Sequence, residues 1–550
     1  MWSGCASTLQ EQMQLPITHT DNTAQWEEAK TTPYGKYPEL VTYTLGKMTG
    51  TNNSNMPEGD TYEDNVYTRY LMDLLNIQNT DAFEATDAQY STNVTMAMAS
   101  GKLPDVMVVD NYEDLALLVE ADMIEDLSEA YENCASDMIK EIYASYGDSI
   151  FNNVMFNGKL MAIPETNISD GPNLLWLRKD WLDELNLSEP KTLADVETIV
   201  RAFMEEHPGN AAGETTGLIC SSTLTGEKGY SYEYLVDIVF ANFGAYPKHW
   251  IENDNGEVVY GSVQPEVKNA LRFLNRWYNE GILDKDFLLR TSSNLIELIV
   301  QGKCGAFFGP WWAPNNPLCD AMQAESGAEW RPYLISTDGS GVTTYCNQSP
   351  SYKYVVVRKG YAHPELVVKQ ISALFDYATN DLTDTTEMEQ YFQQNVDPTA
   401  RPLAINVDFN DALMRCYDGI KDVMAGRRSA DTLSLVERAY YQSCKLYMES
   451  QELAGIDEWA AYASRIEACS LIAEGNIQKK ESLFFGTTET MKSEWWKLKV
   501  KEQNTFLQII TGDKDISYFD QFVTEWNNEG GNAITQEVRI FLDEKNAAEP

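Results

Sequence analysis

The sequence has little positive charge, because 41 Lys and Arg stand against 84 Asp and Glu and leave a formal net charge of -43. A surface of this sign repels phosphate backbones and anionic lipid head groups, which argues against nucleic acid as a partner. Histidine is also scarce, with 4 residues in 550 and none in an HExxH pattern. No GxSxG, GxxxxGK[ST] or GxGxxG motif stands between a strand and a helix. The sequence therefore offers no recognisable catalytic or phosphate-binding motif.

Long hydrophobic runs are missing as well, since no stretch approaches the roughly 18 to 20 apolar residues that a membrane span needs. Near the start, Ser3-Gly4-Cys5 resembles the end of a lipoprotein signal, and we expect Cys5 to carry lipid. The apolar signal region is absent ahead of it and Trp2 stands where Leu is usual, so we expect the chain to start near the mature end. A chance Gly-Cys pair remains the alternative. The polar segment up to residue 36 predicts a flexible tether.

Cysteine pairs with metal-site spacing are absent too. The nine Cys residues fall at irregular intervals with no CxxC, so neither a zinc site nor a redox pair is indicated. We expect most of them to be small buried hydrophobic side chains, while disulfides stay possible. The segment 513–520 (DKDISYFD) lacks the Gly and terminal Glu spacing of a calcium loop. We therefore expect no metal and no cofactor.

What the sequence does contain is an alternation of short apolar runs and amphipathic segments. Residues 39–48 predict a strand, 67–77 a helix, 86–102 a second helix ended by Gly101, and 103–110 a second strand. This order predicts an α/β domain with a largely parallel sheet, which binds ligands at the carboxyl ends of its strands. Asp110 and Asn111 lie at such an end.

The same reading continues along the chain. Strands are predicted at 160–164, 173–178, 304–309 and 351–360, helices at 179–185, 191–207, 229–244, 265–282 and 294–300, and a hairpin at 251–261 with its turn at NDNG. From His363 to about Phe506 the pattern is mainly that of amphipathic helices.

Five of these segments, in this order, resemble the family 1 extracellular solute-binding proteins of carbohydrate ABC transporters, and in particular their long Gram-positive lipoprotein branch. They are GKLMAIP with NLLWLRKDWLDELNL, GEVVYGSVQPEVKNALRFLNRWYNEGILDKDF, GKCGAFFGPWW, YVVVRKGYAHPE, and IITGDKDISYFDQFVTEWNNEGG. Together they span roughly residues 37 to 545.

The resemblance implies an α/β, two-lobed fold of the periplasmic-binding-protein type (type II) with a hinge between the lobes and extra C-terminal helices. It implies residues 1–36 as lipoprotein N-terminus and tether, 37–165 and about 349–450 as lobe 1, 166–348 as lobe 2, and 451–550 as a helical region contacting both lobes. The implied partners are an oligosaccharide and the permease subunits of the transporter. The protein is then expected to be a monomer, lipid-anchored at the extracellular face of the membrane and without enzymatic activity.

Sugar sites pair aromatic plates with short polar side chains, which directs attention to aromatic residues at strand ends. Trp311 matches a Gly-Pro-Trp segment whose tryptophan stacks on sugar in maltose-binding protein, while Trp312 departs from that pattern. Tyr232 and Tyr234 lie on the predicted helix 229–244, which in that relative also offers an aromatic to the ligand. Trp250, before the hairpin, is a further candidate. For Trp311, Trp312 and the two tyrosines the alternative is packing in the core, and for Trp250 it is packing against the hairpin.

The polar candidates come from strand ends and from the places where the chain crosses between lobes. Asp110 and Asn111 have the strand-end argument, with helix capping as the alternative. Further candidates are Thr166 and Asn167 at the first crossing, Asn347 and Tyr352 at the return, and Lys47 at the end of the first strand.

Two other functions stay open at this point. The same fold can bind a non-sugar ligand, either a peptide or an oligo-uronide, and a cluster of Arg in place of aromatic plates would indicate that. A surface glycoside hydrolase is the more distant alternative. Such an enzyme needs two carboxylates about 5 to 10 Å apart, which the sequence alone neither identifies nor excludes.

Overall fold

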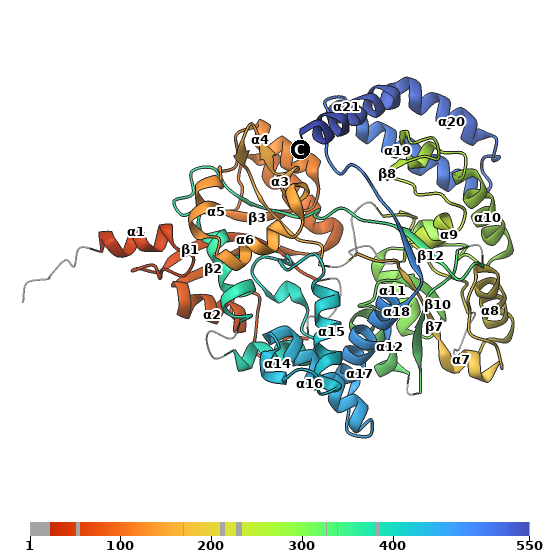
Figure 1. Cartoon of the computed structure of the whole chain (residues 1–550), viewed down its shortest axis with the longest axis horizontal. Helices are drawn as coiled ribbons and strands as arrows, with labels where there is room; N and C mark the ends of the chain where they lie inside the picture. The colour runs from red at the N-terminus through yellow and green to blue at the C-terminus, as the bar shows by residue number, and fades with distance from the viewer. Residues whose placement is uncertain are drawn as a thin grey trace, which may run out of the picture.

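The computed structural model describes residues 22–50, 55–168, 170–208, 215–226, 234–325, 327–337, 339–380 and 385–548. Within them the chain forms two α/β lobes, which stand side by side in Figure 1. The first lobe carries a five-stranded sheet in the order β2-β1-β3-β13-β6, and the second a three-stranded sheet in the order β10-β7-β11.

The first sheet follows from the burial patterns of its strands. β1 (Val41–Met48) alternates buried and exposed residues from Val41 to Leu45 and is then buried through Lys47. All four residues of β3 (Val106–Val109) are buried, as expected for a central strand covered on both faces. β1 pairs in parallel with β2 (Ile77–Ala85) and with β3. β13 (Tyr354–Val357) runs antiparallel to β3 and to β6 (Ile163–Pro164). The sheet is therefore mixed.

The parallel pairing predicted from residues 39–110 is confirmed for β1 and β3, whereas the second sheet is antiparallel. Both β10 (Ala306–Gly309) and β11 (Trp330–Tyr333) pair antiparallel with β7 (Leu174–Arg178). Neither neighbour of β7 directly follows it along the chain, so local patterns could not fix their direction. The remaining strands form two-stranded sheets: β4 (Met155–Phe156) with β5 (Lys159–Leu160), β8 (Trp250–Glu252) with β9 (Val258–Tyr260), and β12 (Thr343–Cys346) with β14 (Ile477–Lys480).

Helices cover both sheets. In the first lobe they are α1 (Thr23–Thr31), α2 (Val66–Leu75), α3 (Asp87–Ser100), α4 (Tyr112–Glu120), α5 (Ser128–Cys134), α6 (Asp137–Ala144), α13 (Leu366–Ser372) and α14 (Thr386–Gln393). In the second they are α7 (Lys179–Glu184), α8 (Leu193–Glu206), α9 (Asp237–Ala241), α10 (Val267–Glu280), α11 (Ser292–Val300) and α12 (Cys319–Ala324). The buried residues of α10 recur every three or four positions, and Gly281 ends it at a φ of 80°.

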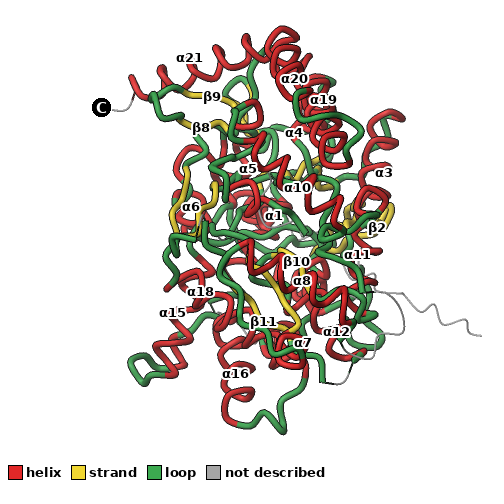
Figure 2. Tube along the Cα trace, turned by 90° about the vertical axis from the view of Figure 1, so that its right-hand side faces the viewer, coloured by secondary structure: helices red, strands yellow, loops and turns green. Residues whose placement is uncertain are grey.

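The C-terminal third is helical in two groups. The first is α15 (Ala412–Met424), α16 (Leu435–Glu449), α17 (Ile456–Tyr462) and α18 (Cys469–Glu474), and the second is α19 (Met491–Thr511), α20 (Tyr518–Trp526) and α21 (Asn532–Ala548). In both views α19–α21 gather at one end of the molecule, and α15 and α16 lie toward the other (Figures 1 and 2).

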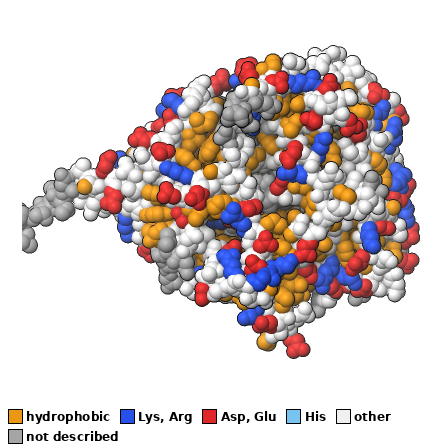
Figure 3. Space-filling model, viewed as in Figure 1, with side chains coloured by type: hydrophobic (Ala, Val, Ile, Leu, Met, Phe, Trp, Pro, Cys, Tyr) orange, Lys and Arg blue, Asp and Glu red, His pale blue; other side chains and the backbone are white. Residues whose placement is uncertain are grey.

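Three clusters of buried apolar side chains hold these elements together. One contains residues of the first lobe between 29 and 163 and between 354 and 407. A second joins the second lobe to α19–α21, and a third joins the other face of β7 and β10 to α15, α17 and α18. Acidic and basic side chains are interspersed over the face drawn in Figure 3, without a broad patch of one sign.

Candidate functional site

Three segments run between the lobes and bond to one another. The backbone N–H of Thr166 donates to the carbonyl of Asn406 at 2.8 Å, and that of Asn167 donates to Pro350 at 2.8 Å. The Thr166 hydroxyl accepts from the backbone N–H of Asp408 at 2.9 Å. The backbone groups of Thr166 and Asn167 and the Thr166 hydroxyl therefore join these three segments to one another.

A cavity of about 120 Å³ opens beside this crossing. Its lining comes from both lobes, from the returning segment and from the chain that leads into α19. The lining residues are Asn111, Tyr112, Glu113, Asn153, Lys248, His249, Trp250, Ser349, Ser351, Tyr352, Tyr354, Phe484, Phe485, Gly486, Thr487, Met491, Trp495 and Lys499. Three of the candidates, Asn111, Trp250 and Tyr352, are thus brought together. We call this space the interlobe cavity.

Asn111 has a structural task in addition to its place on the interlobe cavity. Its side-chain oxygen accepts from the backbone N–H of Asp114 at 2.7 Å, which caps α4. Its amide nitrogen donates to Asp110 Oδ1 at 3.2 Å and to Asp114 Oδ2 at 2.8 Å. The capping alternative is therefore confirmed for Asn111. Asp110 orients this amide and also accepts from the Ser91 hydroxyl at 3.4 Å.

The second lobe gives the interlobe cavity an aromatic wall. Trp250 is 3% exposed, and its ring centroid lies 5.0 Å from that of Tyr260 and 6.3 Å from that of Trp495. The sequence indicated no role for Trp495, because only the placement of α19 over β8 brings it here. Burial lowers the pKa of the neighbouring His249 to about 4, so this imidazole is neutral at physiological pH.

Contacts from the first lobe to the C-terminal region border the same cavity. Lys499 Nζ lies 2.7 Å from Glu113 Oε1, and the side-chain amide of Asn153 donates to the carbonyl of Phe485 at 2.8 Å. Asn347 is not among the lining residues. Its side-chain oxygen accepts from the backbone N–H of Ser482 at 2.5 Å, so Asn347 fastens the segment after β14 to the end of β12.

Trp311 and Trp312 belong to a different group of side chains, at the end of β10. Trp311 is 4% exposed and lies under the guanidinium of Arg465, whose central carbon is 4.4 Å from the ring centroid. Trp312 is half-buried and packs against the third apolar cluster, which contains Trp311. The sequence did not single out Arg465, since its helix showed only an amphipathic pattern.

The tyrosine candidates require a correction. Of the predicted helix 229–244, the structure describes residues 234–244, and within them the helix is limited to α9, while Tyr234 precedes it with a φ of 63°. Its backbone N–H donates to the carbonyl of Phe308 at 3.1 Å, and its carbonyl accepts from Ser221, so pairing with β10 prevents helix formation. Tyr234 is 2% exposed, with its ring against Phe307. Tyr232 lies outside the described residues, as does Cys5.

Lys47 is also placed differently from what we expected. Its side chain is fully buried, and its ammonium donates to the carbonyls of Thr399, Arg401 and Pro402. Burial lowers its pKa to about 7. Since its three protons are directed at backbone carbonyls, Lys47 ties β1 to the 399–402 segment and presents no donor to a ligand.

Neither a metal site nor a membrane span emerges from the part of the chain that the structure describes. There, no three His, Cys, Asp or Glu side chains are grouped so that they could hold a metal ion. No helix in those residues combines the length and the apolar character that crossing a bilayer requires. The described cysteines are free thiols buried in the interior.

The sequence matches the family model of bacterial extracellular solute-binding proteins over residues 82–381, which is more than half of the chain. The protein belongs to this family. It is 22% identical over 467 residues to lipoprotein LipO of Bacillus subtilis, covering 82% of this chain and 84% of LipO. It is 24% identical over 480 residues to the polygalacturonan/rhamnogalacturonan-binding protein YtcQ of the same organism, covering 85% and 87%.

Solved structures agree on the fold. The alginate-binding protein AlgQ2 without calcium ion superimposes with a TM-score of 0.63 at 15% identity, over 92% of this chain and 99% of AlgQ2. The Streptococcus pneumoniae substrate-binding protein FusA, an EF-hand mutant bound to fructo-nystose, gives 0.61 at 12% identity, over 92% and 100%. The two-lobed solute-binding fold expected from the sequence is confirmed.

Proposed function

We propose that this protein is the oligosaccharide-binding component of an ABC importer. Family membership gives the class, a receptor that binds solute and passes it on. The observation that carries the sugar proposal is the interlobe cavity, where Trp250, Trp495 and Tyr352 stand beside amides and hydroxyls. Aromatic faces pack against the C–H faces of sugar rings, and short polar groups bond their hydroxyls.

Relatives support the same ligand class. YtcQ is named for binding polygalacturonan and rhamnogalacturonan, and FusA for fructooligosaccharide. The ligand contacts that we propose are Asn111, Trp250 and Tyr352 in the interlobe cavity and Trp311 and Trp312 at the end of β10. Asp110, Thr166, Asn167 and Asn347 stay in the proposed set as residues around the crossing, and Tyr232, which lies outside the described residues, stays a candidate. Tyr234 is left out because it is buried against Phe307. Lys47 is left out.

The proposal extends to location and chemistry. The protein acts outside the cell as its family does, and we propose that lipid on Cys5 anchors it, with the permease as partner. The predicted tether 1–36 is too long, because Thr23–Thr31 form α1 and Ala29 is buried in the core of the first lobe, so we propose only the residues before α1 as tether. It works as a monomer and releases its ligand unchanged. For the lobes, we propose residues 37–165 and about 349–450 for the first and 166–348 for the second, with 451–550 contacting both.

A ligand screen tests the function. Neutral and acidic oligosaccharides are added to the protein, the melting temperature is recorded, and every hit is followed by calorimetry and by chromatography of the recovered ligand. A ligand that binds only the folded state raises the melting temperature, by about 2.7 kcal/mol of added stability at 100 times Kd. A saturable shift with intact ligand is expected. Cleaved ligand would establish the hydrolase instead, and a response to peptides alone would establish a peptide receptor.

A variant identifies the site. Tyr352→Ala removes one aromatic face from the interlobe cavity and is expected to weaken binding by about 10-fold, the effect of one lost stacking contact. Tyr518→Ala, on α20, is the matched control, since Tyr518 does not line this cavity. Equal affinities of the Tyr352→Ala variant and the unaltered protein would place the ligand elsewhere.

A further inference from the structure

A second cavity, of about 40 Å³, lies next to the interlobe cavity, and we call it the side cavity. His249 borders both spaces, and the segments 246–250 and 344–352 each contribute residues to both linings. A single buried water needs about 10 to 15 Å³ of such space. The side cavity can therefore hold a group of a few heavy atoms that projects from a ligand, but it is too small for a sugar ring.

Most of the wall of the side cavity is apolar. Buried aliphatic side chains form it on and around α9, namely Leu235, Ile238, Ala241, Ala245 and Pro247. Hydroxyl and amide groups are added by Tyr246, Thr344 and Gln348. A group that fits this lining is apolar over much of its surface and carries only a few polar atoms.

Asp237 contributes a carboxylate to the same lining, from the first turn of α9. Its Oδ1 accepts from the backbone N–H of Gly226 at 3.0 Å, whereas its Oδ2 is buried and has no hydrogen-bond partner among the described residues. Asp284, another buried carboxylate of this lobe, has the guanidinium of Arg290 at 2.8 Å. An oxygen buried without a donor is costly, and an N–H or O–H group from a ligand would remove that cost.

We propose that the side cavity binds the acetamido group of an N-acetylated amino sugar, whose N–H donates to Asp237 Oδ2, while the sugar ring lies in the interlobe cavity. This inference rests on the proposed function and names the class of sugar. An acetamido group has a methyl for the apolar wall and an N–H for the carboxylate. Its carbonyl can accept from the hydroxyl of Tyr246 or from the amide of Gln348.

Other donors fit the side cavity less well. A hydroxyl can bond the carboxylate but leaves the apolar wall uncovered. A protonated amine would be repelled by Lys248, whose positive charge already acts on Asp237, and it brings no methyl group. The acetamido group is the one of these three that uses both the carboxylate and the apolar wall.

The test compares three tetrasaccharides with the same β-1,4-linked rings and a different group at C2. Chitotetraose carries an acetamido group there, cellotetraose a hydroxyl, and the chitosan tetramer an amine. In calorimetry, chitotetraose is expected to bind about 10- to 100-fold more tightly than cellotetraose, as for one charge-assisted hydrogen bond and one buried methyl group. The chitosan tetramer should also bind less tightly than chitotetraose.

Asp237→Asn tests the carboxylate. The Asn oxygen can still accept from Gly226, but its amide replaces Oδ2 and turns a donor toward the N–H of the ligand. The variant is therefore expected to lose most of the preference for chitotetraose over cellotetraose. Asp195→Asn is the matched control and should keep that preference, because Asp195 lies in the first turn of α8 and lines neither cavity.

A second variant keeps the inference testable if Asp237→Asn fails to fold. Ala241→Val adds two methyl groups to the wall of the side cavity, where Ala241 is 3% exposed, and should reduce the same preference by occupying the space of the acetyl group.

Cellotetraose or the chitosan tetramer binding as tightly as chitotetraose would overturn the acetamido inference. So would chitotetraose that fails to bind while another oligosaccharide of the ligand screen binds, and the receptor function would stand in each of these cases. An unchanged preference in folded Asp237→Asn would overturn the role of Asp237. If no oligosaccharide of any kind bound, the proposed function itself would fail.

Discussion

Arg178 lies at the end of β7, with its side chain 2% exposed, and it neutralises Asp180 and Glu325 while covering the ring of Trp181 at 4.5 Å. Replacing it with Met leaves two carboxylates without their cation. We expect Arg178→Met to lower the free energy of unfolding by about 3 kcal/mol, as measured by urea titration.

The control for this change is Arg427→Met. Arg427 pairs with Asp422 on the surface, where its side chain is 60% exposed, and such pairs contribute about 0 to 1 kcal/mol. Equal losses in the two variants would contradict the distinction between the buried and the exposed cation.

Asp237 begins α9 and borders the side cavity. Burial raises its pKa to about 6, although its Oδ1 accepts from the backbone N–H of Gly226 at 3.0 Å. Between pH 3.8 and 6 the folded protein therefore holds a proton that the unfolded chain releases, so this group makes the fold less stable as pH rises through that window.

Asp237→Asn keeps the acceptor and removes the titration. We expect its melting temperature to exceed that of the unaltered protein at pH 7.5 and to match it at pH 4. The measurement is scanning calorimetry at both values. A difference that was the same at pH 4 and pH 7.5 would show that the carboxyl does not titrate between them.

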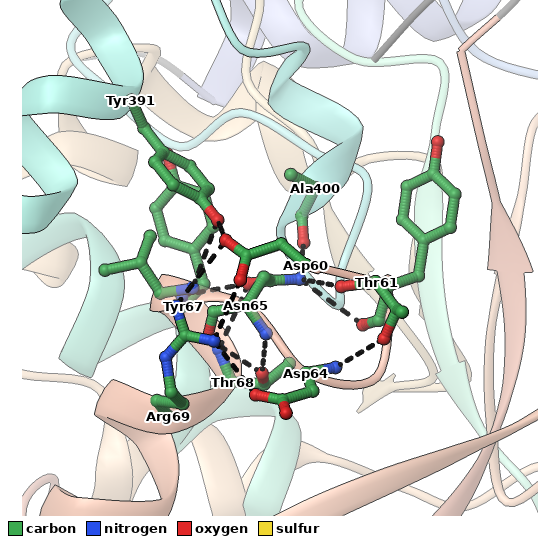
Figure 4. Close-up of polar contacts among 11 residues, drawn as sticks. Asp60, Thr61, Asp64, Asn65, Tyr67, Thr68, Arg69, Tyr391 and Ala400 are labelled. Atoms are coloured by element: carbon green, nitrogen blue, oxygen red, sulfur yellow. Dashed lines mark hydrogen bonds and ion pairs between the residues drawn. The ribbon is translucent and has the colours of Figure 1, made fainter. Parts of the chain in front are cut away.

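At the scale of elements, α2 depends on Asn65 for its start. The Asn65 side-chain oxygen accepts from the backbone N–H of Tyr67 at 2.9 Å, and its amide donates to the carbonyls of Thr61 at 2.8 Å and Ala400 at 3.0 Å. Figure 4 shows these bonds, together with the contact of Asp60 with Arg69 and Tyr391. One side chain thus begins a helix and holds the 400 segment against it.

We expect Asn65→Ala to cost about 2 kcal/mol of unfolding free energy, the sum of a lost cap and an unpaired carbonyl. Asn65→Asp separates the two effects, because it keeps the capping oxygen and loses the donor to Ala400. Urea titrations of the three proteins should place Asn65→Asp between the others. A loss as large as that of Asn65→Ala would assign the whole effect to the donated bonds.

Several elements were predictable because their signals are local. The runs of β1 and β3, the helix α10 with its terminal Gly281, and the NDNG turn between β8 and β9 each depend on residues within one segment. The predicted helix 229–244 was wrong at Tyr234 because a distant strand, β10, takes up its backbone N–H. Where a segment pairs with another part of the chain, local periodicity does not decide its conformation.

At the scale of the whole molecule, the net charge of -43 should influence how a charged ligand arrives. An acidic oligosaccharide approaches against the field of the protein, and salt screens that field over about 10 Å at 0.1 M. We expect its association rate, followed by tryptophan fluorescence in a stopped-flow instrument, to rise about twofold or more between 20 and 200 mM NaCl. A neutral oligosaccharide is the control and should show no such rise. A rate that fell with salt would indicate attraction by Lys248 and Lys499 at the interlobe cavity instead.

The sequence by itself determined the fold class, the order of most elements and the family, because these depend on composition, periodicity and segment order. It also led to Asn111 at a strand end, Trp250 before the hairpin and Tyr352 at a crossing. Only the tertiary structure decided that Trp495 joins the interlobe cavity, that the protons of Lys47 are directed at backbone carbonyls, and that Asp237 lines the side cavity with one oxygen unpartnered among the described residues. Each of these depends on contacts between residues far apart in the chain, and burial and charge pairing are properties of such contacts rather than of any local pattern.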